Sequence, residues 1–213
     1  MSAIKKFIGS VYSFAADRFY EPVVVKGGFR LFGGNLNDLA IEQGRRAVEV
    51  AEGGPILDMP VGTAYFTAPL ARAHPGLVVG SDIAWGMVAR SMEVAEEEAT
   101  TNLRCVQADA HALPFPDDTF PAVMCTNGLQ VIPGLEPTIY ELARVTKPGG
   151  YLFVSVLTLP APRAVREVRR GKLPTIMLSG SDIAAVIERS GLELLALRSE
   201  SLATLIEAHK PTF

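Results

Sequence analysis

Three acidic residues stand at the ends of successive apolar runs in this sequence. Asp58 follows "PIL", Asp82 follows "GLVVGS" and Asp109 follows "LRCVQA". Carboxylates accept hydrogen bonds from hydroxyl, amide and ammonium groups, and they repel phosphate. If the three runs are parallel strands of one sheet, the three acids line one edge of it. That edge would suit a ligand that carries hydroxyl and ammonium groups.

The spacing of Gly62 and Asp82 points to a ribose. The two residues are 20 positions apart, the spacing at which an acid at the end of the second strand binds the ribose hydroxyls of a nucleotide cofactor. Dinucleotides also use this acid, so the turn after the first strand must distinguish the cofactors. That turn reads MPVGTAYF and lacks the glycine triplet that lets a backbone approach a pyrophosphate. A dinucleotide is therefore disfavoured.

The acids need a parallel sheet to bring them together, and the pattern of the chain predicts one. From about residue 55 onward, short apolar runs alternate with longer segments of helical spacing. We predict strands within 55–59, 76–82, 102–109, 121–129 and 151–157, and helices at 65–74, 86–100 and 137–147. Pro148 should stop the last of these helices. Strands of almost wholly apolar sequence are typically buried on both faces, so helices should cover both sides of the sheet.

The carboxyl-terminal part predicts a different end to the sheet. A helix at 179–191, with a Ser or Asp cap and a glycine stop, precedes two apolar runs at 192–201 and 202–210. Two consecutive strands joined by a short turn pair antiparallel. The predicted fold is therefore α/β and Rossmann-like, a doubly wound, mostly parallel sheet of seven strands. It has an antiparallel terminal strand and helices on both faces.

The length of 213 residues suits a single domain. We divide it into an amino-terminal helical lid (1–45), a cofactor-binding core (53–157), an acceptor-side insertion (158–178) and a terminal helix with the strand pair (179–213). The start of the chain loosely imitates a secretory signal, but its apolar run, FIGSVYSFAA, is too short to span a bilayer. Its helical spacing fits an amphipathic helix packed on the domain. We therefore expect a cytoplasmic protein without an integral membrane span.

The charge of the chain argues against nucleic acid as a partner. Its 20 basic and 23 acidic residues give a net charge of −3, so no positive field is present to hold a phosphate backbone. Cys105 and Cys125 form no CxxC pair and lie in apolar runs, where buried free thiols are expected.

Four motifs between residues 53 and 155 resemble the class I S-adenosylmethionine-dependent methyltransferases. The likeness is to the small-molecule branch that includes the quinone-biosynthesis enzymes. LDMPVGTA is similar to the first motif, DxGxGxG, and VVGSDIAWGMVARS is similar to the second. VQADAHALPFPDDTFPAVMC resembles the segment that leads from the third to the fourth strand, and LARVTKPGGYLFVS resembles the stretch before the fifth. Pro60 and Ala64 stand where the family prefers glycine.

The resemblance implies S-adenosylmethionine as the cofactor and methyl transfer by direct displacement to a small, hydrophobic acceptor molecule. Carried over by position, Asp82 binds the ribose hydroxyls, Ile83 packs on the adenine, and Asp109 accepts from the adenine amino group. The implied cofactor-binding residues are Asp58, Pro60, Gly62, Thr63, Asp82, Ile83, Met87, Asp109, Ala110, Asn127 and Gly128.

Direct displacement requires alignment of the reactants and exclusion of water more than it requires a base. Neither a nucleophilic side chain nor a metal is expected. Candidates for positioning the acceptor are Asn127, Gln130, His111 and Tyr20. His74, which ends a helix and precedes a proline, is expected to be solvated. The basic segment at 161–171 is either a solvated helix face or a contact for an anionic acceptor or a membrane surface.

Two other functions stay open at this point. A protein of the same fold could bind the cofactor, or have lost it, and serve as a cyclase-like or partner-binding scaffold. The altered turn with Pro60 and Ala64 favours that alternative. A nicotinamide-dependent oxidoreductase is disfavoured by the missing glycine triplet and by the terminal pair of strands, and a shared fold does not by itself settle function.

Overall fold

The computed structural model describes residues 36–158, 177–200 and 202–212. Its helices are α3 (Leu36–Ala51), α4 (Thr67–Ala73), α5 (Trp85–Glu97), α6 (Leu135–Val145) and α8 (Gly180–Arg189). Its strands are β1 (Ile56–Asp58), β2 (Val78–Asp82), β3 (Leu103–Gln107), β4 (Phe120–Thr126), β5 (Thr146–Leu157), β6 (Glu193–Glu200) and β7 (Ala203–His209).

These strands form one seven-stranded sheet in the order β3-β2-β1-β4-β5-β7-β6. The first five strands in this order are parallel, and β7 runs antiparallel between β5 and β6. The chain winds outward from β1 in one direction and from β4 in the other. The carboxyl ends of β1 and β4 therefore flank the switch point at which open α/β sheets bind ligands. The predicted fold class is confirmed, including the antiparallel terminal strand.

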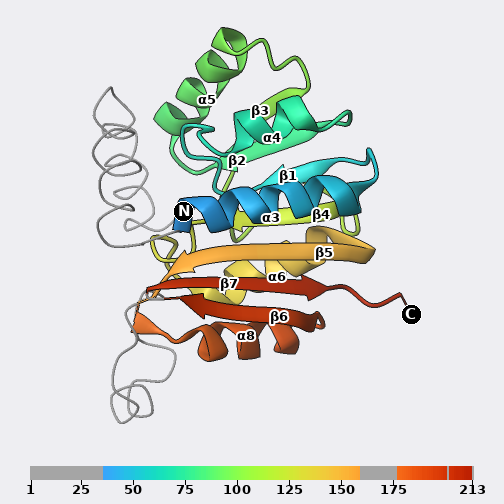
Figure 1. The fold of residues 1–213 in the computed structure, drawn as a ribbon, viewed down its shortest axis with the longest axis vertical. Helices are drawn as coiled ribbons and strands as arrows, with labels where there is room; N and C mark the ends of the chain where they lie inside the picture. Colours follow the sequence, from blue (N-terminus) through green and yellow to red (C-terminus); the bar gives the residue numbers. More distant parts are fainter. Residues whose placement is uncertain (1–35, 159–176, 201, 213) are drawn as a thin grey trace.

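The sheet separates two hydrophobic cores, because successive residues of a strand point to opposite faces. Ile56 and Phe153 pack in the core beneath α3, α4 and α5, whereas Leu57 and Val154 pack in the core beneath α6 and α8. Figure 1 shows α3 across the near side of the sheet, with α6 and α8 behind it. Every residue of β1, β2 and β4 is buried. This burial on both faces explains the apolar sequences of these strands.

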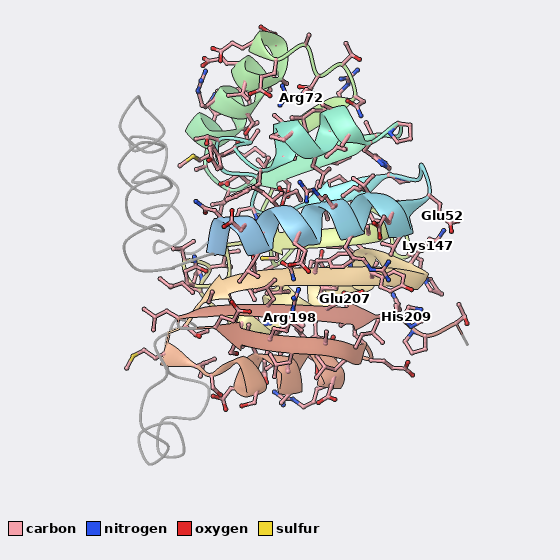
Figure 2. The ribbon with its side chains drawn as sticks, in the orientation of Figure 1. Glu52, Arg72, Lys147, Arg198, Glu207 and His209 are labelled. Atoms are coloured by element: carbon pink, nitrogen blue, oxygen red, sulfur yellow. The ribbon has the colours of Figure 1, made fainter. Side chains whose placement is uncertain are left out.

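Helix α3 overlaps the predicted helical lid over residues 36–45, but no helix was predicted for 46–51 and none was predicted to pack on the sheet here. Its buried residues Leu39, Gln43 and Ala47 lie on one helical face, and the helix packs on β4 and β5. On the side of β6 and β7 shown in Figure 2, Arg198 and Glu207 lie beside α3, and each forms an ion pair with a residue of that helix. Helix α3 is thus part of the packed domain.

Two of the predicted domain segments lie largely outside the described residues. The predicted lid includes 1–35, with Tyr20, and only its last part, 36–45, is described, as the start of α3. The insertion includes 159–176, with the predicted basic helix. Both assignments stay predictions. In the described parts of the chain, no helix combines the length and the apolar character needed to cross a bilayer.

Two local predictions were wrong. His74, expected to be solvated, is only 3% exposed, and its Nε2 lies 2.8 Å from the carbonyl oxygen of Gly54. Helix α6 ends at Val145 rather than at Pro148, because Thr146 already pairs with β4. In both cases a contact with a distant part of the chain outweighs the local pattern.

Lys210 caps the carboxyl end of α6. Its Nζ donates to the carbonyl oxygens of Ala143 and Thr146, each at 2.8 Å, and lies 2.7 Å from Oδ1 of Asp118. Carbonyl groups at the end of a helix lack partners in the helix itself, and a cation there complements the helix dipole. We expect Lys210→Met to lower the free energy of unfolding by about 2 kcal/mol, measured by urea denaturation. Lys147→Met, at an exposed position nearby, is the control, and equal losses in both variants would contradict the capping role.

Candidate functional site

A cleft opens where β1, β2, β3 and β4 end, at the predicted edge of the sheet. Its empty space, counted together with the open solvent at its mouth, is about 1030 Å³. Ten of the residues predicted to bind the cofactor line it: Asp58, Pro60, Gly62, Thr63, Asp82, Ile83, Met87, Asp109, Ala110 and Asn127. The sheet thus brings together side chains that are far apart in the sequence.

Three of the predicted site residues that the structure describes do not line this cleft. Gly128 lies against the ring of Pro60, Gln130 donates to the main chain of Asn127, and His111 lies against Gly134. Tyr20 lies outside the described residues. Any role of Gly128, Gln130 and His111 in the cleft is therefore indirect, through the residues that they contact.

The remaining lining residues are mostly apolar and were not predicted as site residues from the sequence. They are Met59, Val61, Tyr65, Phe66, Ala108, Thr126, Val131, Ile132 and Pro133. Tyr65 and Phe66 make an edge-to-face contact with ring centroids 4.9 Å apart. Both were assigned to the helix at 65–74, but α4 begins at Thr67, so the two rings belong to the turn. The sequence signal that could have identified these two lining residues is an aromatic pair placed directly after a ligand-binding turn.

The charge of the cleft is one-sided. Asp58, Asp82 and Asp109 line it, and no lysine, arginine or histidine does so among the described residues. A ligand rich in phosphate would meet only negative charge there. A ligand with hydroxyl groups or positive charge would instead find acceptors.

Asp82 connects two turns at the floor of the cleft. Its Oδ2 accepts from the Gly62 amide at 3.1 Å and its Oδ1 from the Ala84 amide at 2.9 Å. A carboxylate has about four lone-pair positions, so this group can still accept from a ligand hydroxyl. Burial raises the pKa of Asp82 to about 6, and the hydrogen bonds from backbone amides only partly oppose this shift.

Asp58 carries an acceptor atom without a partner. Thr67 Oγ1 donates to Asp58 Oδ2 at 2.5 Å, whereas Oδ1 is shielded from solvent and has no hydrogen bond within the described residues. Burial is the main cause that raises the pKa of Asp58 to about 7, and the nearby charge of Asp82 adds to the rise. An unpaired buried acceptor is costly. A ligand N–H group that reached it would remove that cost.

Ionisation of Asp58 should weaken the unliganded protein as the pH rises. Its folded-state pKa of about 7 lies above the ordinary value of 3.8, so the folded protein binds this proton more tightly than the unfolded chain. The stability contributed by the protonated group is therefore lost as pH rises from about 4 to about 7. We expect Asp58→Asn to raise the melting temperature, relative to the unchanged protein, by more at about pH 8 than at about pH 4.

Thermal unfolding scans at the two pH values test this expectation. Asp38→Asn, which changes an exposed acid in the first turn of α3, is the matched control. A gain in melting temperature for Asp58→Asn that did not depend on pH would contradict the expectation.

The turn after β1 accommodates Pro60 and Ala64, the two residues that stand where the resembled family prefers glycine, in different ways. The peptide between Met59 and Pro60 is cis, and the Pro60 ring occupies the space beside Gly128. Ala64 is fully buried with φ +61°, a conformation that glycine adopts more readily. Gly62, the glycine that is kept, has φ +57° and nothing within 4 Å of the position that a Cβ would take. The turn therefore leaves open space at Gly62, where the backbone meets the cleft.

An ion-pair network holds the loop that carries Asp109. Arg144 of α6 donates to the carbonyl oxygens of Leu113 and Phe115, and it pairs with Glu141 at 2.7 Å. Glu141 Oε1 in turn accepts from the Leu113 amide at 2.7 Å. The Arg144 guanidinium lowers the pKa of Glu141. The loop between β3 and β4 is thus fixed to α6, although it contains no helix.

Known proteins share both the sequence and the fold of this region. Residues 56–150 match the family described as a methyltransferase domain. A demethylmenaquinone methyltransferase of Thermus thermophilus is 42% identical over 122 residues, which cover 55% of this chain and 54% of that protein. The chain spans about half the length of the curated relatives that it matches.

Solved structures agree in fold. A SAM-dependent methyltransferase from Aquifex aeolicus matches with a TM-score of 0.65 and 19% identity, covering 79% of this chain and 88% of that one. The [4+2]-cyclase SpnF matches with a TM-score of 0.69 and 19% identity, covering 81% of this chain and 82% of that one. At these identities the likeness concerns the fold alone.

Proposed function

We propose that the protein transfers a methyl group from S-adenosylmethionine to a small, hydrophobic acceptor. The premise is that residues 56–150 form a methyltransferase domain of the class I S-adenosylmethionine-dependent family. The observation that carries this proposal is the placement of Asp58, Asp82 and Asp109 around one cleft that no described basic side chain lines. S-adenosylmethionine offers ribose hydroxyls, an amino group on its adenine, an ammonium group and a positively charged sulfur.

Each part of the cofactor has residues of suitable chemistry in the cleft. Asp82 would accept from the ribose hydroxyls through its free lone pairs, and Ile83 with Met87 would pack on the adenine. Asp109 would accept from the adenine amino group, with Ala110 beside it. The residues present therefore fit the cofactor.

Asp58 and Gly62 would hold the methionine part of the cofactor. The unpaired Oδ1 of Asp58 suits the ammonium group, and the open space at Gly62 allows a close approach of the ligand to the backbone. Pro60 supplies no amide donor, so the contacts of the turn come from Gly62 and its neighbours. The cis proline and the alanine at position 64 do not fill this space.

When bound, the cofactor would supply a methyl group on a sulfonium: the acceptor would form the new bond to that methyl and release one proton to solvent, while the electron pair of the broken carbon–sulfur bond would stay on sulfur. The protein's own contribution is alignment and shielding. Tyr65, Phe66 and Val131 to Pro133 line the cleft, and their apolar surfaces would form walls that exclude water. Ionised Asp58 and Asp82 stabilise positive charge in the cleft.

A quinone-like ring, reduced to its quinol, is the acceptor that we propose. The name of the Thermus thermophilus relative gives demethylmenaquinone as the molecule on which that protein acts. The apolar walls of the cleft suit a flat, uncharged ring. Residues 1–45 and 158–178 are the segments that we propose to complete the acceptor side.

Methyl transfer to a defined acceptor tests this proposal. The full chain is incubated with S-adenosylmethionine carrying a labelled methyl group and with a short-chain demethylmenaquinol under a reducing agent. We expect the label in the quinol and stoichiometric formation of S-adenosylhomocysteine, detected by mass spectrometry. Binding of the cofactor without any labelled quinol would contradict the proposed acceptor.

A protein of the same fold that does not methylate is the second candidate. The observation in its favour is that Pro60 and Ala64 both replace glycines of the first motif, and that Ala64 holds a left-handed conformation. This alternative expects S-adenosylmethionine to be bound but not consumed with any acceptor. Formation of S-adenosylhomocysteine in an acceptor-dependent way would eliminate it.

A further inference from the structure

We propose that the side-chain amide of Asn127 donates a hydrogen bond to an oxygen atom of the methyl acceptor, and that Ser155 is the positioning residue that orients this amide. The inference rests on the proposed function, since it names the group that recognises the acceptor in the same cleft. It adds Ser155, which does not line the cleft, and it gives Asn127 a definite role.

The backbone fixes Asn127 at the end of β4. Its amide nitrogen donates to the carbonyl oxygen of Ser155 at 2.8 Å, which continues the pairing of β4 with β5 by one residue. Asn127 has φ +52°, a left-handed conformation that asparagine tolerates better than most residues. The side chain therefore leaves the regular alternation of the strand at the point where the cleft begins.

The side-chain amide of Asn127 is held at one end only. The Ser155 hydroxyl, which is completely buried, donates to Asn127 Oδ1 at 3.5 Å. Asn127 Nδ2 is shielded from solvent and has no hydrogen bond within the described residues. Because Oδ1 already accepts from Ser155, the amide keeps Nδ2, with its two N–H donors, for a ligand.

Gln130 holds the main chain of Asn127. Its Nε2 donates to the carbonyl oxygen of Asn127 at 2.7 Å, within the turn that follows β4. Gln130 does not line the cleft, so it acts on a ligand only through Asn127. Ser155 and Gln130 thus both contact Asn127, whose Nδ2 donor is unpaired within the described residues.

The position of Asn127 favours the acceptor over the cofactor as its partner. The residues that follow it, Val131 to Pro133, form the apolar wall that we assign to the acceptor ring. When they are ionised, the carboxylates of the cleft can accept hydrogen bonds but cannot donate them, and their charge repels an oxygen that carries negative charge. A neutral amide donor stabilises a carbonyl or phenolate oxygen without adding a charge that would have to be buried.

The test compares two ring ligands of similar shape. 1,4-Dihydroxynaphthalene presents two oxygen atoms, and 1,4-dimethylnaphthalene replaces them with methyl groups. Affinity is measured with S-adenosylhomocysteine bound and a reducing agent present. The fluorescence of Trp85 gives the signal, since it is the only tryptophan of the chain, is 58% exposed and starts α5 between Ile83 and Met87 of the cleft.

We expect the unchanged protein to prefer the diol, and we expect Asn127→Ala to reduce this preference by about 10-fold, the effect of about one hydrogen bond. Ser155→Ala should reduce it less, because the amide remains but is no longer oriented. Ser81→Ala removes another fully buried strand hydroxyl, which has no partner within the described residues, and should leave the preference unchanged. Affinity for S-adenosylhomocysteine should be the same in all four proteins.

Three results would overturn the inference. The first is equal affinity of the unchanged protein for the two rings, or binding of neither. The second is an unaltered preference in Asn127→Ala. The third is a loss of S-adenosylhomocysteine affinity in that variant, which would assign the amide to the cofactor. Failure of the proposed function would give other results. Either the protein would not bind the cofactor, or it would bind the cofactor and the ring ligand but transfer no methyl group.

Discussion

Asp82→Ala should abolish tight binding of S-adenosylmethionine and of S-adenosylhomocysteine. Asp82 is the acid that we assign to the ribose, and its carboxylate also accepts from the Gly62 and Ala84 amides. Two hydrogen bonds to a charged acceptor contribute about 3 kcal/mol, which corresponds to roughly a 100-fold rise in the dissociation constant. The same substitution releases the Gly62 amide, so the turn after β1 loses a support as well. Calorimetric titration measures the effect.

Two further variants separate the ribose contact from general damage. Asp82→Asn keeps one carbonyl acceptor and should lose affinity by about 10-fold. Glu96→Ala removes an exposed acid from the same α5 segment that follows Asp82 and should bind as the unchanged protein does. Thermal unfolding curves establish that each variant is folded. An unchanged affinity in a folded Asp82→Ala protein would refute the ribose assignment.

Gly128→Ala should distort the turn after β1, which lines the cleft. A Cβ at this position would lie 2.0 Å from Pro60 Cδ and 2.5 Å from Pro60 Cγ, far inside any tolerable contact. The ring cannot move away freely, since Pro60 lies in the turn between Met59, whose amide is bonded to β4, and Val61, whose amide is bonded to β2. We expect a loss of about 3 kcal/mol in the free energy of unfolding and loss of cofactor binding, measured by urea denaturation and calorimetry.

The partner substitution gives this prediction a sharp control. Pro60→Gly removes the ring and introduces the glycine that class I methyltransferases prefer at this position. Combined with Gly128→Ala, it should recover most of the lost stability, because the added methyl then occupies the space left by the ring. A double variant as damaged as Gly128→Ala alone would show that the clash with Pro60 is not the cause. The cycle therefore tests why Gly128 is required.

The parallel sheet and its acidic edge were predictable from the sequence for a definite reason. Short apolar runs buried on both faces alternate with helical spacing, and all carboxyl ends of parallel strands meet at one edge. Once the runs before Asp58 and Asp82 are recognised as strands, their common location follows. The capping box at Ser179 is equally local and marks the start of α8 as expected.

Helix α3 was not predictable in this way because its buried face gives a weak apolar signal. That face includes small residues such as Ala40 and Ala47 and the polar side chain of Gln43. Gln43 can be buried because its amide donates to the carbonyl oxygens of Val154 and Ile206. Those partners come from β5 and β7, more than 100 positions away, so only the folded chain reveals them.

The finer design of the site also depends on distant contacts. Pro60 and Gly128 are each unremarkable in sequence, yet their packing decides how the turn is built. The link from Ser155 to Asn127 spans 28 positions and two strands. Sequence spacing identified the residues at the strand ends, whereas the contacts that orient them required the structure.

Calorimetric titration of the full chain determines whether the cleft binds S-adenosylmethionine. The titrants are S-adenosylmethionine, S-adenosylhomocysteine and, as the control, NAD. The acidic cleft without a described basic residue predicts micromolar binding of the first two and none of NAD. Absence of binding by S-adenosylmethionine and S-adenosylhomocysteine would contradict the claim and leave the non-methylating scaffold as the function of this fold.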